Sequence, residues 1–199
     1  MRNSFSIIAL LLFSFLSADT LEAKRFRFTG GGEISKSSKD EDTCKLTVGD
    51  LLITLSSEVK GLKNKPDKLV LYFHVRVENP TGETETFEFP PESYLKEASG
   101  QIYRYTEPDV AIDQLINRSA GFRTMIVGGL AGPLAGPAVT DAVEKEFRGR
   151  YGANALRSGM IPEHSFIEGI VFFEPFKNDD KRPLELVVPG WPSIALDYR

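Results

Sequence analysis

Cysteine and histidine are scarce in this chain of 199 residues, which contains one cysteine and two histidines. Because one cysteine cannot form a disulfide within the chain, the fold has to be stabilised by an apolar core. Cys44 is therefore either a small buried residue or a free thiol that links two chains. His74 and His164 have no second histidine or cysteine at the spacing of a metal site such as H-E-x-x-H, so we expect no metal ion and no cofactor.

An excess of positive charge is also missing. The formal net charge is −4 and 26% of the residues are charged, which is an ordinary globular mixture. Proteins that bind nucleic acid without sequence preference neutralise its phosphates with many lysines and arginines. The acidic balance therefore excludes a non-specific nucleic-acid binder, and we predict no nucleic-acid partner.

The motifs of common enzymes are absent as well. The chain has no G-x-S-x-G nucleophile elbow, and its three consecutive glycines at residues 30–32 lack the Lys-Ser/Thr pair of a phosphate-binding loop. Residues 178–180, Asn-Asp-Asp, indicate a turn, because the spaced oxygen ligands of a calcium loop are missing. Catalysis would require the two histidines or several carboxylates to converge, and no pattern suggests that they do. We therefore predict that the protein is not an enzyme and has no catalytic residues.

An apolar run occupies the N-terminus. Residues 5–16 are hydrophobic and follow the short basic start Met-Arg-Asn-Ser. The run has the length of the apolar core of a secretory signal peptide and is too short to span a bilayer comfortably, although an uncleaved anchor is the alternative. Ala18 and Ala23 could each precede the cleaved bond, and Ala23 leaves a polar region before the cut. We predict a signal peptide over residues 1–23 and a secreted or periplasmic location, with association to the cell envelope as an option.

Residues 24–44 show no apolar period. The three glycines are followed by small, polar and charged residues from Ser35 to Asp42. Such a composition is typical of a flexible connection. We predict a flexible linker over residues 24–44 and a folded domain over residues 45–199.

The clearest periodic segment is residues 68–80, Lys-Leu-Val-Leu-Tyr-Phe-His-Val-Arg-Val-Glu-Asn-Pro. Its odd-numbered positions from 69 to 77 are all Leu, Phe or Val, and its even-numbered positions end in His74, Arg76 and Glu78. Alternation with a period of two predicts a β-strand with one face in a core and the other toward water. The turn residues Asn-Pro-Thr-Gly end this strand.

Further short strands are predicted on both sides of this one. They fall in residues 45–58, 84–89, 93–96, 101–105, 165–173, 184–188 and 191–198. In the segment 165–173, Ile167, Val171 and Phe173 share a face with Gly169. Short strands separated by turns, without crossover helices between neighbours, favour antiparallel pairing. We predict a mainly β fold, an immunoglobulin-like antiparallel β-sandwich.

Residues 106–160 interrupt the strand pattern and predict a helical insertion between two strands. Thr106, Pro108 and Asp109 have the order of a helix start, with a hydroxyl cap, a proline in the first turn and an acid three positions after the cap. The apolar residues of this first helix fall on one face: Ile112, Leu115 and Ile116. A second helix is predicted over residues 142–150, with three apolar residues in line: Val139, Val143 and Phe147.

The most unusual stretch of the insertion is residues 124–139, which carries no charge and has a glycine at every fourth position, Gly128, Gly132 and Gly136. Small residues one helical turn apart allow another helix to approach closely. We predict that this stretch makes partner or oligomer contacts. The residues involved are the three glycines and the neighbouring apolar side chains Ile126, Val127, Leu130 and Leu134.

Three arrangements of this stretch remain open. It can fold onto the sandwich as a helical hairpin, with bends at Pro133 and Pro137. It can pack against the same stretch of another chain and form an oligomer. It can also lie on or dip into a membrane, although its uncharged run is shorter than the ~20 residues that a transmembrane helix needs.

Several segments of the chain resemble a known family. They are residues 75–81, the hairpin over residues 94–103, residues 162–173 with their central glycine, and the Leu-x-Leu at residues 184–186. Outside the insertion, residues 45–188 thus resemble bacterial secreted immunoglobulin-like domains of the telokin-like type, a family of unassigned function. The chain departs from that pattern at Glu163, where a glycine is more usual, and in the long Gly-rich insertion. The resemblance implies a fold and an extracytoplasmic location, and it implies no catalytic residues.

Together these observations predict a non-enzymatic extracytoplasmic module of the cell envelope with a binding or structural role. It presents loops and the Gly-rich helical insertion to a protein partner. The alternative is a membrane-associated or self-assembling envelope protein that acts through Gly128, Gly132 and Gly136.

Overall fold

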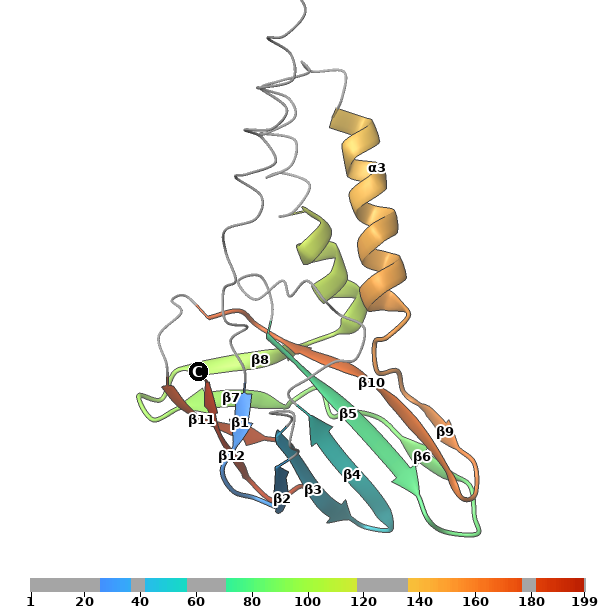
Figure 1. Ribbon diagram of the computed structural model, residues 1–199, viewed down its shortest axis with the longest axis vertical. Helices are drawn as coiled ribbons and strands as arrows, with labels where there is room; N and C mark the ends of the chain where they lie inside the picture. The colour runs from blue at the N-terminus through green and yellow to red at the C-terminus, as the bar shows by residue number, and fades with distance from the viewer. Residues whose placement is uncertain (1–25, 37–41, 57–70, 118–135, 177–181, 199) are drawn as a thin grey trace, which may run out of the picture.

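The structure, a computed structural model, describes residues 26–36, 42–56, 71–117, 136–176 and 182–198 (Figure 1). It is mainly β, with 51% strand and 17% helix, so the predicted fold class is confirmed at that level. No helix within the described ranges is both long enough and apolar enough to cross a membrane.

The described strands fall into two groups separated by helices. The first group is β1 (Phe26–Phe28), β2 (Glu33–Lys36), β3 (Asp42–Val48), β4 (Leu51–Ser56), β5 (Leu71–Asn79), β6 (Glu85–Phe87), β7 (Tyr94–Glu97) and β8 (Ile102–Thr106). A helix over residues 108–117, the helix α3 (Gly136–Phe147) and the short π-helix η2 (Arg148–Gly152) follow. The second group is β9 (Gly159–Ile161), β10 (Ser165–Phe173), β11 (Arg182–Val187) and β12 (Ile194–Tyr198).

Ten of the described strands form one antiparallel sheet in the order β1-β12-β11-β7-β8-β10-β5-β4-β3-β2. The sheet curls into a near-barrel. Its two halves meet at a short ladder between β8 and β10, through the pairs Phe172↔Thr106 and Phe173↔Tyr105. β6 and β9 form a separate two-stranded sheet. The mainly β, antiparallel prediction is confirmed, whereas a specific immunoglobulin-like sandwich is not.

The strand predicted over residues 68–80 is confirmed as β5. It pairs with β10 along its whole length on one side and with β4 on the other. The side chains at positions 71, 73, 75 and 77 are buried, while His74, Arg76 and Glu78 are partly exposed. The period of two therefore predicted both the strand and the face that points inward.

Aromatic side chains from both halves of the sheet meet inside the near-barrel. The ring centroid of Phe73 in β5 is 4.4 Å from that of Phe26, 6.1 Å from that of Phe28 and 5.6 Å from that of Phe173. All four side chains are buried. These contacts join β1, β5 and β10 into one core. Full burial of each such side chain stabilises the folded state by about 2 kcal/mol.

The prediction of a flexible linker over residues 24–44 is wrong for the described part of that range. β1 pairs with β12 and β2 pairs with β3, so residues 26–36 connect the two edges of the ten-stranded sheet. Phe26 and Phe28 are buried in the core. The segment is therefore a kinked strand that covers both edges, which short terminal strands commonly do in stable sheets.

The glycines at the kink allow two backbone segments to approach closely. Gly31 has φ +99°, and a Cβ on it would lie 2.4 Å from the carbonyl oxygen of Ser193. A Cβ on Gly32 would lie 2.4 Å from the carbonyl oxygen of Lys45. These positions require glycine, because no other residue leaves room for the neighbouring strands. The composition that suggested flexibility instead reflects tight packing.

The helices lie between β8 and β9, in the interval where the sequence predicts a helical insertion. They cover part of the outer face of β5 and β10 through an apolar cluster that is separate from the core of the near-barrel (Figure 1). The helical face predicted for the first helix is buried in this cluster. Its members include Ile112, Leu115 and Ile116 from the first helix, Phe147 and Tyr151 from the end of the second, and Tyr72, Ile170 and Phe172 from the strands.

β10 is buried on both faces over its second half. The predicted inward face is confirmed at Gly169, Val171 and Phe173. Ile170 and Phe172 are also buried, because the helices cover the opposite face of the strand. The continuous apolar run over these positions is typical of a strand that is covered on both sides.

Candidate interaction surface

The residues predicted to make partner or oligomer contacts lie almost entirely outside the described residues. This applies to Ile126, Val127, Gly128, Leu130, Gly132 and Leu134, whereas Gly136 is the first residue of α3. Their role stays a prediction. The described part of the insertion shows how α3 is attached to the sheet.

α3 projects away from the sheet and is attached to it at its C-terminal end (Figure 1). There Phe147 and Tyr151 are buried with their ring centroids 5.5 Å apart. Arg148 forms ion pairs at 2.8 Å with Asp113 of the first helix and with Glu144 of α3. Exposed ion pairs contribute little to stability, so the apolar contacts hold the helices on the sheet.

The two histidines lie in separate environments. His74 is half-buried on the outer face of β5, as predicted, and pairs with Ile170 in the ladder. His164 is exposed in the turn before β10, with φ 52°. Within the described ranges no group of three or more His, Cys, Asp and Glu side chains could hold a metal ion.

Cys44 has no exposed surface and pairs with Leu55 in the ladder between β3 and β4. Burial raises the pKa of its thiol, which disfavours the reactive thiolate. A Cβ on Gly32 would lie 2.9 Å from the Cys44 Sγ, so the N-terminal strand passes directly over the sulfur. This position agrees with the first predicted alternative, a small buried residue.

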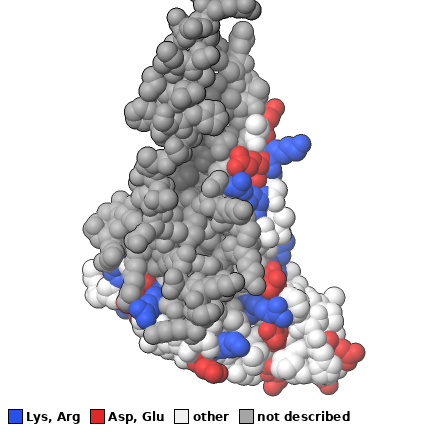
Figure 2. Space-filling view, in the orientation of Figure 1, with Lys and Arg blue, Asp and Glu red and all other residues white. Residues whose placement is uncertain are grey.

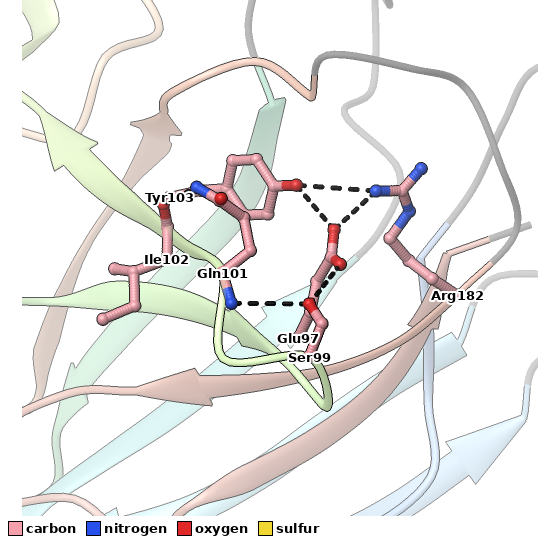
Figure 3. A network of polar contacts seen from close by, with 6 residues as sticks. All are labelled: Glu97, Ser99, Gln101, Ile102, Tyr103 and Arg182. Atoms are coloured by element: carbon pink, nitrogen blue, oxygen red, sulfur yellow. Dashed lines mark hydrogen bonds and ion pairs between the residues drawn. The ribbon is translucent and has the colours of Figure 1, made fainter.

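A polar cluster that no sequence motif revealed connects the β7–β8 hairpin to β11 (Figure 3). The carboxylate of Glu97 accepts hydrogen bonds at 2.5 Å from the hydroxyl of Tyr103 and from Nη1 of Arg182. Ser99 donates to the other carboxylate oxygen at 3.0 Å. The guanidinium carbon of Arg182 also lies 4.8 Å from the ring centroid of Phe176. Glu97 and Arg182 are 85 positions apart, so no local pattern could pair them.

The charges of this polar cluster stabilise one another. Burial alone would raise the pKa of Glu97, but hydrogen bonds from Tyr103, Arg182 and Ser99 lower it below its ordinary value. Burial, followed by the Glu97 carboxylate, raises the pKa of Tyr103 to about 12. Burial alone would lower the pKa of Arg182, but Glu97 raises it. The three groups thus form a bridge between the β7–β8 hairpin and β11.

The outer face of the sheet is covered by helices at one end and open at the other. At the covered end lie Tyr72, Ile170 and Phe172. At the open end the ladders place Leu52 of β4, Glu78 of β5 and Phe166 of β10 side by side, with Arg76 and Glu168 in the next row. We call the side chains of Leu52, Arg76, Glu78, Phe166 and Glu168 the open patch.

The open patch combines an exposed aromatic ring with a shared arginine. Phe166 is 45% exposed and Leu52 is 36% exposed. The guanidinium carbon of Arg76 lies 3.6 Å from the ring centroid of Phe166. Arg76 also pairs with Glu78 at 2.8 Å and with Glu168 at 3.4 Å. Aromatic residues and arginine are enriched in protein interfaces, so this patch is the candidate interaction surface of the described chain.

Asn79 joins the turns next to the open patch. Its side chain is 1% exposed, and Nδ2 donates to the carbonyl oxygens of Glu83 at 2.7 Å, Ile161 at 3.0 Å and Pro162 at 3.2 Å. Its Oδ1 accepts hydrogen bonds from the backbone N–H and the hydroxyl of Thr81 at 3.0 and 2.7 Å. Asn79 therefore connects the turn after β5 to the turn before β10.

This end of the molecule carries mainly negative charge. No Lys or Arg occurs in residues 77–95 or 158–176. Glu83, Glu85 and Glu163 form no ion pair with any described residue. Figure 2 shows acidic side chains along the lower right edge of the molecule.

The chain matches no protein-family model, no curated protein and no solved structure. The resemblance of residues 45–188 to secreted immunoglobulin-like domains therefore stays a prediction. The functional proposal rests on the geometry of the described residues.

Proposed function

We propose that the protein is an exported, non-enzymatic binding module of the cell envelope that engages a protein partner through the open patch and the helical insertion. The observation that carries the proposal is the exposure of Phe166 and Leu52 on a sheet face that helices cover elsewhere. Apolar side chains left exposed together in this way are typical of interaction sites.

Export is supported by the N-terminal pattern. The apolar run over residues 5–16 has the length of a signal-peptide core. With cleavage after Ala23, the mature chain starts just before the first described strand, β1. The proposed location is therefore secreted or periplasmic, with attachment to the envelope through the partner.

A non-enzymatic role is supported by the use of the polar side chains. Glu97, Tyr103 and Arg182 satisfy one another in a bridge between strands. His74 and His164 lie apart, one on a strand and one in a turn. The hydroxyl of Tyr103 does contact the Glu97 carboxylate, but burial raises the pKa of this phenol to about 12, which disfavours the phenolate that a nucleophile would need.

We also propose that the near-barrel is a variant of the immunoglobulin-like sandwich. Ring contacts such as Phe26–Phe73 and Phe28–Phe73 connect the two halves of the sheet across the core, as inner faces do in a sandwich. Among the described strands, the halves pair with each other at the short ladder between β8 and β10, and the segment of β1 and β2 connects their outer edges. An experimental structure with two facing sheets would support this relation.

A self-assembling or membrane-associated envelope protein is the second candidate. It would act through Gly128, Gly132 and Gly136. The observation in its favour is that α3 begins at Gly136 and projects away from the sheet (Figure 1). Light scattering on the mature chain, with and without residues 120–139 replaced by a Gly-Ser linker, separates the two candidates. An oligomer that dissociates when residues 120–139 are replaced favours self-assembly. If the mature chain and the replacement variant are both monomers, self-assembly is ruled out.

Fractionation and site-specific photo-crosslinking in the native cell test the main proposal. A photoreactive residue is placed at Leu52 in the open patch, at Lys145 on α3, or at Glu92 as an exposed control. We expect a shortened chain in the secreted or periplasmic fraction and one protein cross-linked from Leu52 or Lys145 but not from Glu92. A full-length cytoplasmic chain, or the same products from all three positions, would contradict the proposal.

A further inference from the structure

We infer that the open patch binds a cationic segment of the partner protein, one that carries Lys or Arg beside an aliphatic side chain. This inference rests on the proposed function and names the chemistry of the partner at that surface. It follows from two properties of the patch, the spacing of its apolar side chains and the sign of its charge.

The apolar side chains are spaced for a short segment of extended chain. Leu52 and Phe166 lie on either side of Glu78 in the ladder, two strand spacings apart. Neighbouring strands are about 4.8 Å apart, so the two side chains are separated by about 10 Å. An extended segment rises about 3.3 Å per residue and covers this distance in about three residues. A partner segment that crosses the strands can therefore contact both side chains.

The carboxylates of the open patch are only partly neutralised. Arg76 contacts one oxygen of Glu78 and one oxygen of Glu168, and these two side chains remain 42% and 45% exposed. Each carboxylate thus has an oxygen that can accept a hydrogen bond from an incoming Lys or Arg. Such charge-assisted bonds are shorter and stronger than neutral ones.

The electrostatic field around the open patch is negative as well. Glu83, Glu85 and Glu163 lie in the turns and strand next to the patch. The basic side chains in the row of Arg76 and Glu168 are Arg76 itself and the exposed Lys45 of β3, which pairs with Thr54. Together with Glu78 and Glu168, the acidic side chains here outnumber these two bases. A negative field attracts a cationic segment and accelerates its association. It repels an anionic membrane surface, and it would bring like charges together in a symmetric pair of these chains. Charge complementarity therefore selects a cationic partner segment over those two occupants.

Peptide titration of the mature protein, followed by amide chemical shifts, tests this inference. The probe is a short synthetic peptide that alternates Lys and Leu, and its matched control carries Glu in place of Lys. We expect shifts centred on β4, β5 and β10 with the Lys peptide and none with the Glu peptide. The affinity should fall with added salt, because the contact is partly electrostatic.

Two variants and one control locate the binding. Glu78→Gln with Glu168→Gln should weaken binding of the Lys peptide at least fivefold, and so should Phe166→Ser. Glu92→Gln with Asp141→Asn removes the same charge from exposed positions elsewhere and should change the affinity by less than twofold. If the control weakens binding as much as the patch variants, or if the Glu peptide binds equally well, the inference is wrong.

The other occupants give different results. A dimer that Phe166→Ser abolishes in light scattering, or binding to anionic lipid vesicles that the same variant abolishes, would overturn the inference. The proposed function fails in a different way, since it depends on export and on cross-linking in the cell. The peptide titration uses the purified protein and measures neither export nor cross-linking, so failure of the inference can be distinguished from failure of the proposed function.

Discussion

Gly169 and Leu156 are in direct backbone contact. A Cβ on Gly169 would lie 2.4 Å from the backbone nitrogen of Leu156, closer than real Cβ atoms come to any neighbour. That nitrogen donates to the carbonyl oxygen of Ile170 at 3.0 Å, and the nitrogen of Ile170 donates to the carbonyl oxygen of Asn154 at 2.7 Å. The chain that returns from the helices therefore runs flat against β10, and glycine is the residue that permits it.

Gly169→Ala should destabilise the fold. The added Cβ meets backbone atoms, which cannot move aside by side-chain rotation, so strands must shift. Overpacking of this kind lowers the free energy of unfolding by about 1–3 kcal/mol, measurable by urea denaturation. Gly159→Ala is the matched control, because a Cβ there meets nothing within 4 Å. Equal stability of the two variants would show that the chain does not cross β10 as described.

Phe28→Ala should destabilise the fold although it lies in the segment predicted as a linker. The side chain is 1% exposed and contacts Phe73 across the near-barrel. Truncation of a buried phenylalanine lowers the free energy of unfolding by about 3–5 kcal/mol. Thermal unfolding of this variant and of Ser35→Ala, an exposed position in the same segment, provides the comparison. A truly flexible linker would give two variants as stable as the parent chain.

Tyr103→Phe should change the response of stability to alkaline pH. The fold raises the pKa of Tyr103 to about 12 from 10.0, so its contribution to stability is complete below pH 10 and is lost as the pH rises toward 12. The variant should be less stable by about 1 kcal/mol at neutral pH and should lose stability less steeply between pH 10 and 12. Denaturation curves across this range measure both effects, with Tyr94→Phe as the control. An unchanged slope would mean that burial and the Glu97 carboxylate do not raise the pKa of the phenol in the folded protein.

Asn79→Leu should loosen the end of the sheet that carries the open patch. It removes the donor to the carbonyl oxygens of Glu83, Ile161 and Pro162. Unsatisfied buried groups of this kind lower stability by about 1–3 kcal/mol. Hydrogen exchange should show faster exchange in β6 and β9 than in the parent chain, while Thr86→Ala, an exposed change in β6, should leave it unaltered. If the amides of β6 and β9 exchange as slowly in Asn79→Leu as in the parent chain, Asn79 does not stabilise this end of the sheet.

Reductant should not change the molar mass of the mature protein. Cys44 is completely buried and its thiol pKa is raised, so it cannot form a disulfide between native chains. Light scattering with and without reductant checks this, and labelling with a thiol reagent should be slow until the protein is denatured. An oligomer that reductant dissociates would show that the strand over Cys44 opens in the native state.

Local patterns were sufficient for the elements whose signal lies within a few neighbouring residues. The alternation over residues 68–80 predicted β5 and its buried face, because a strand exposes alternate side chains wherever it pairs. Pro108 and the acid that follows it predicted the helix over residues 108–117, because a helix start depends on residues within one turn. The hairpin of β7 and β8 was predicted for the same reason. The predicted cap at Thr106 is wrong, since Thr106 ends β8 and the carbonyl oxygen of Glu107 accepts the first helical hydrogen bond.

The sequence by itself determined the class of the fold and the inward face of its longest strand, since both follow from short-range periodicity. Only the tertiary structure decided which distant segments of the chain pair or pack with one another. It turned the glycines of the predicted linker into a kinked strand between β12 and β3, covered the second face of β10 with helices, and joined Glu97 to Arg182 across 85 positions. It also left Phe166 exposed beside Arg76. The physical reason is that pairing, burial and charge contact depend on which distant segments meet, and a local pattern carries no information about that choice.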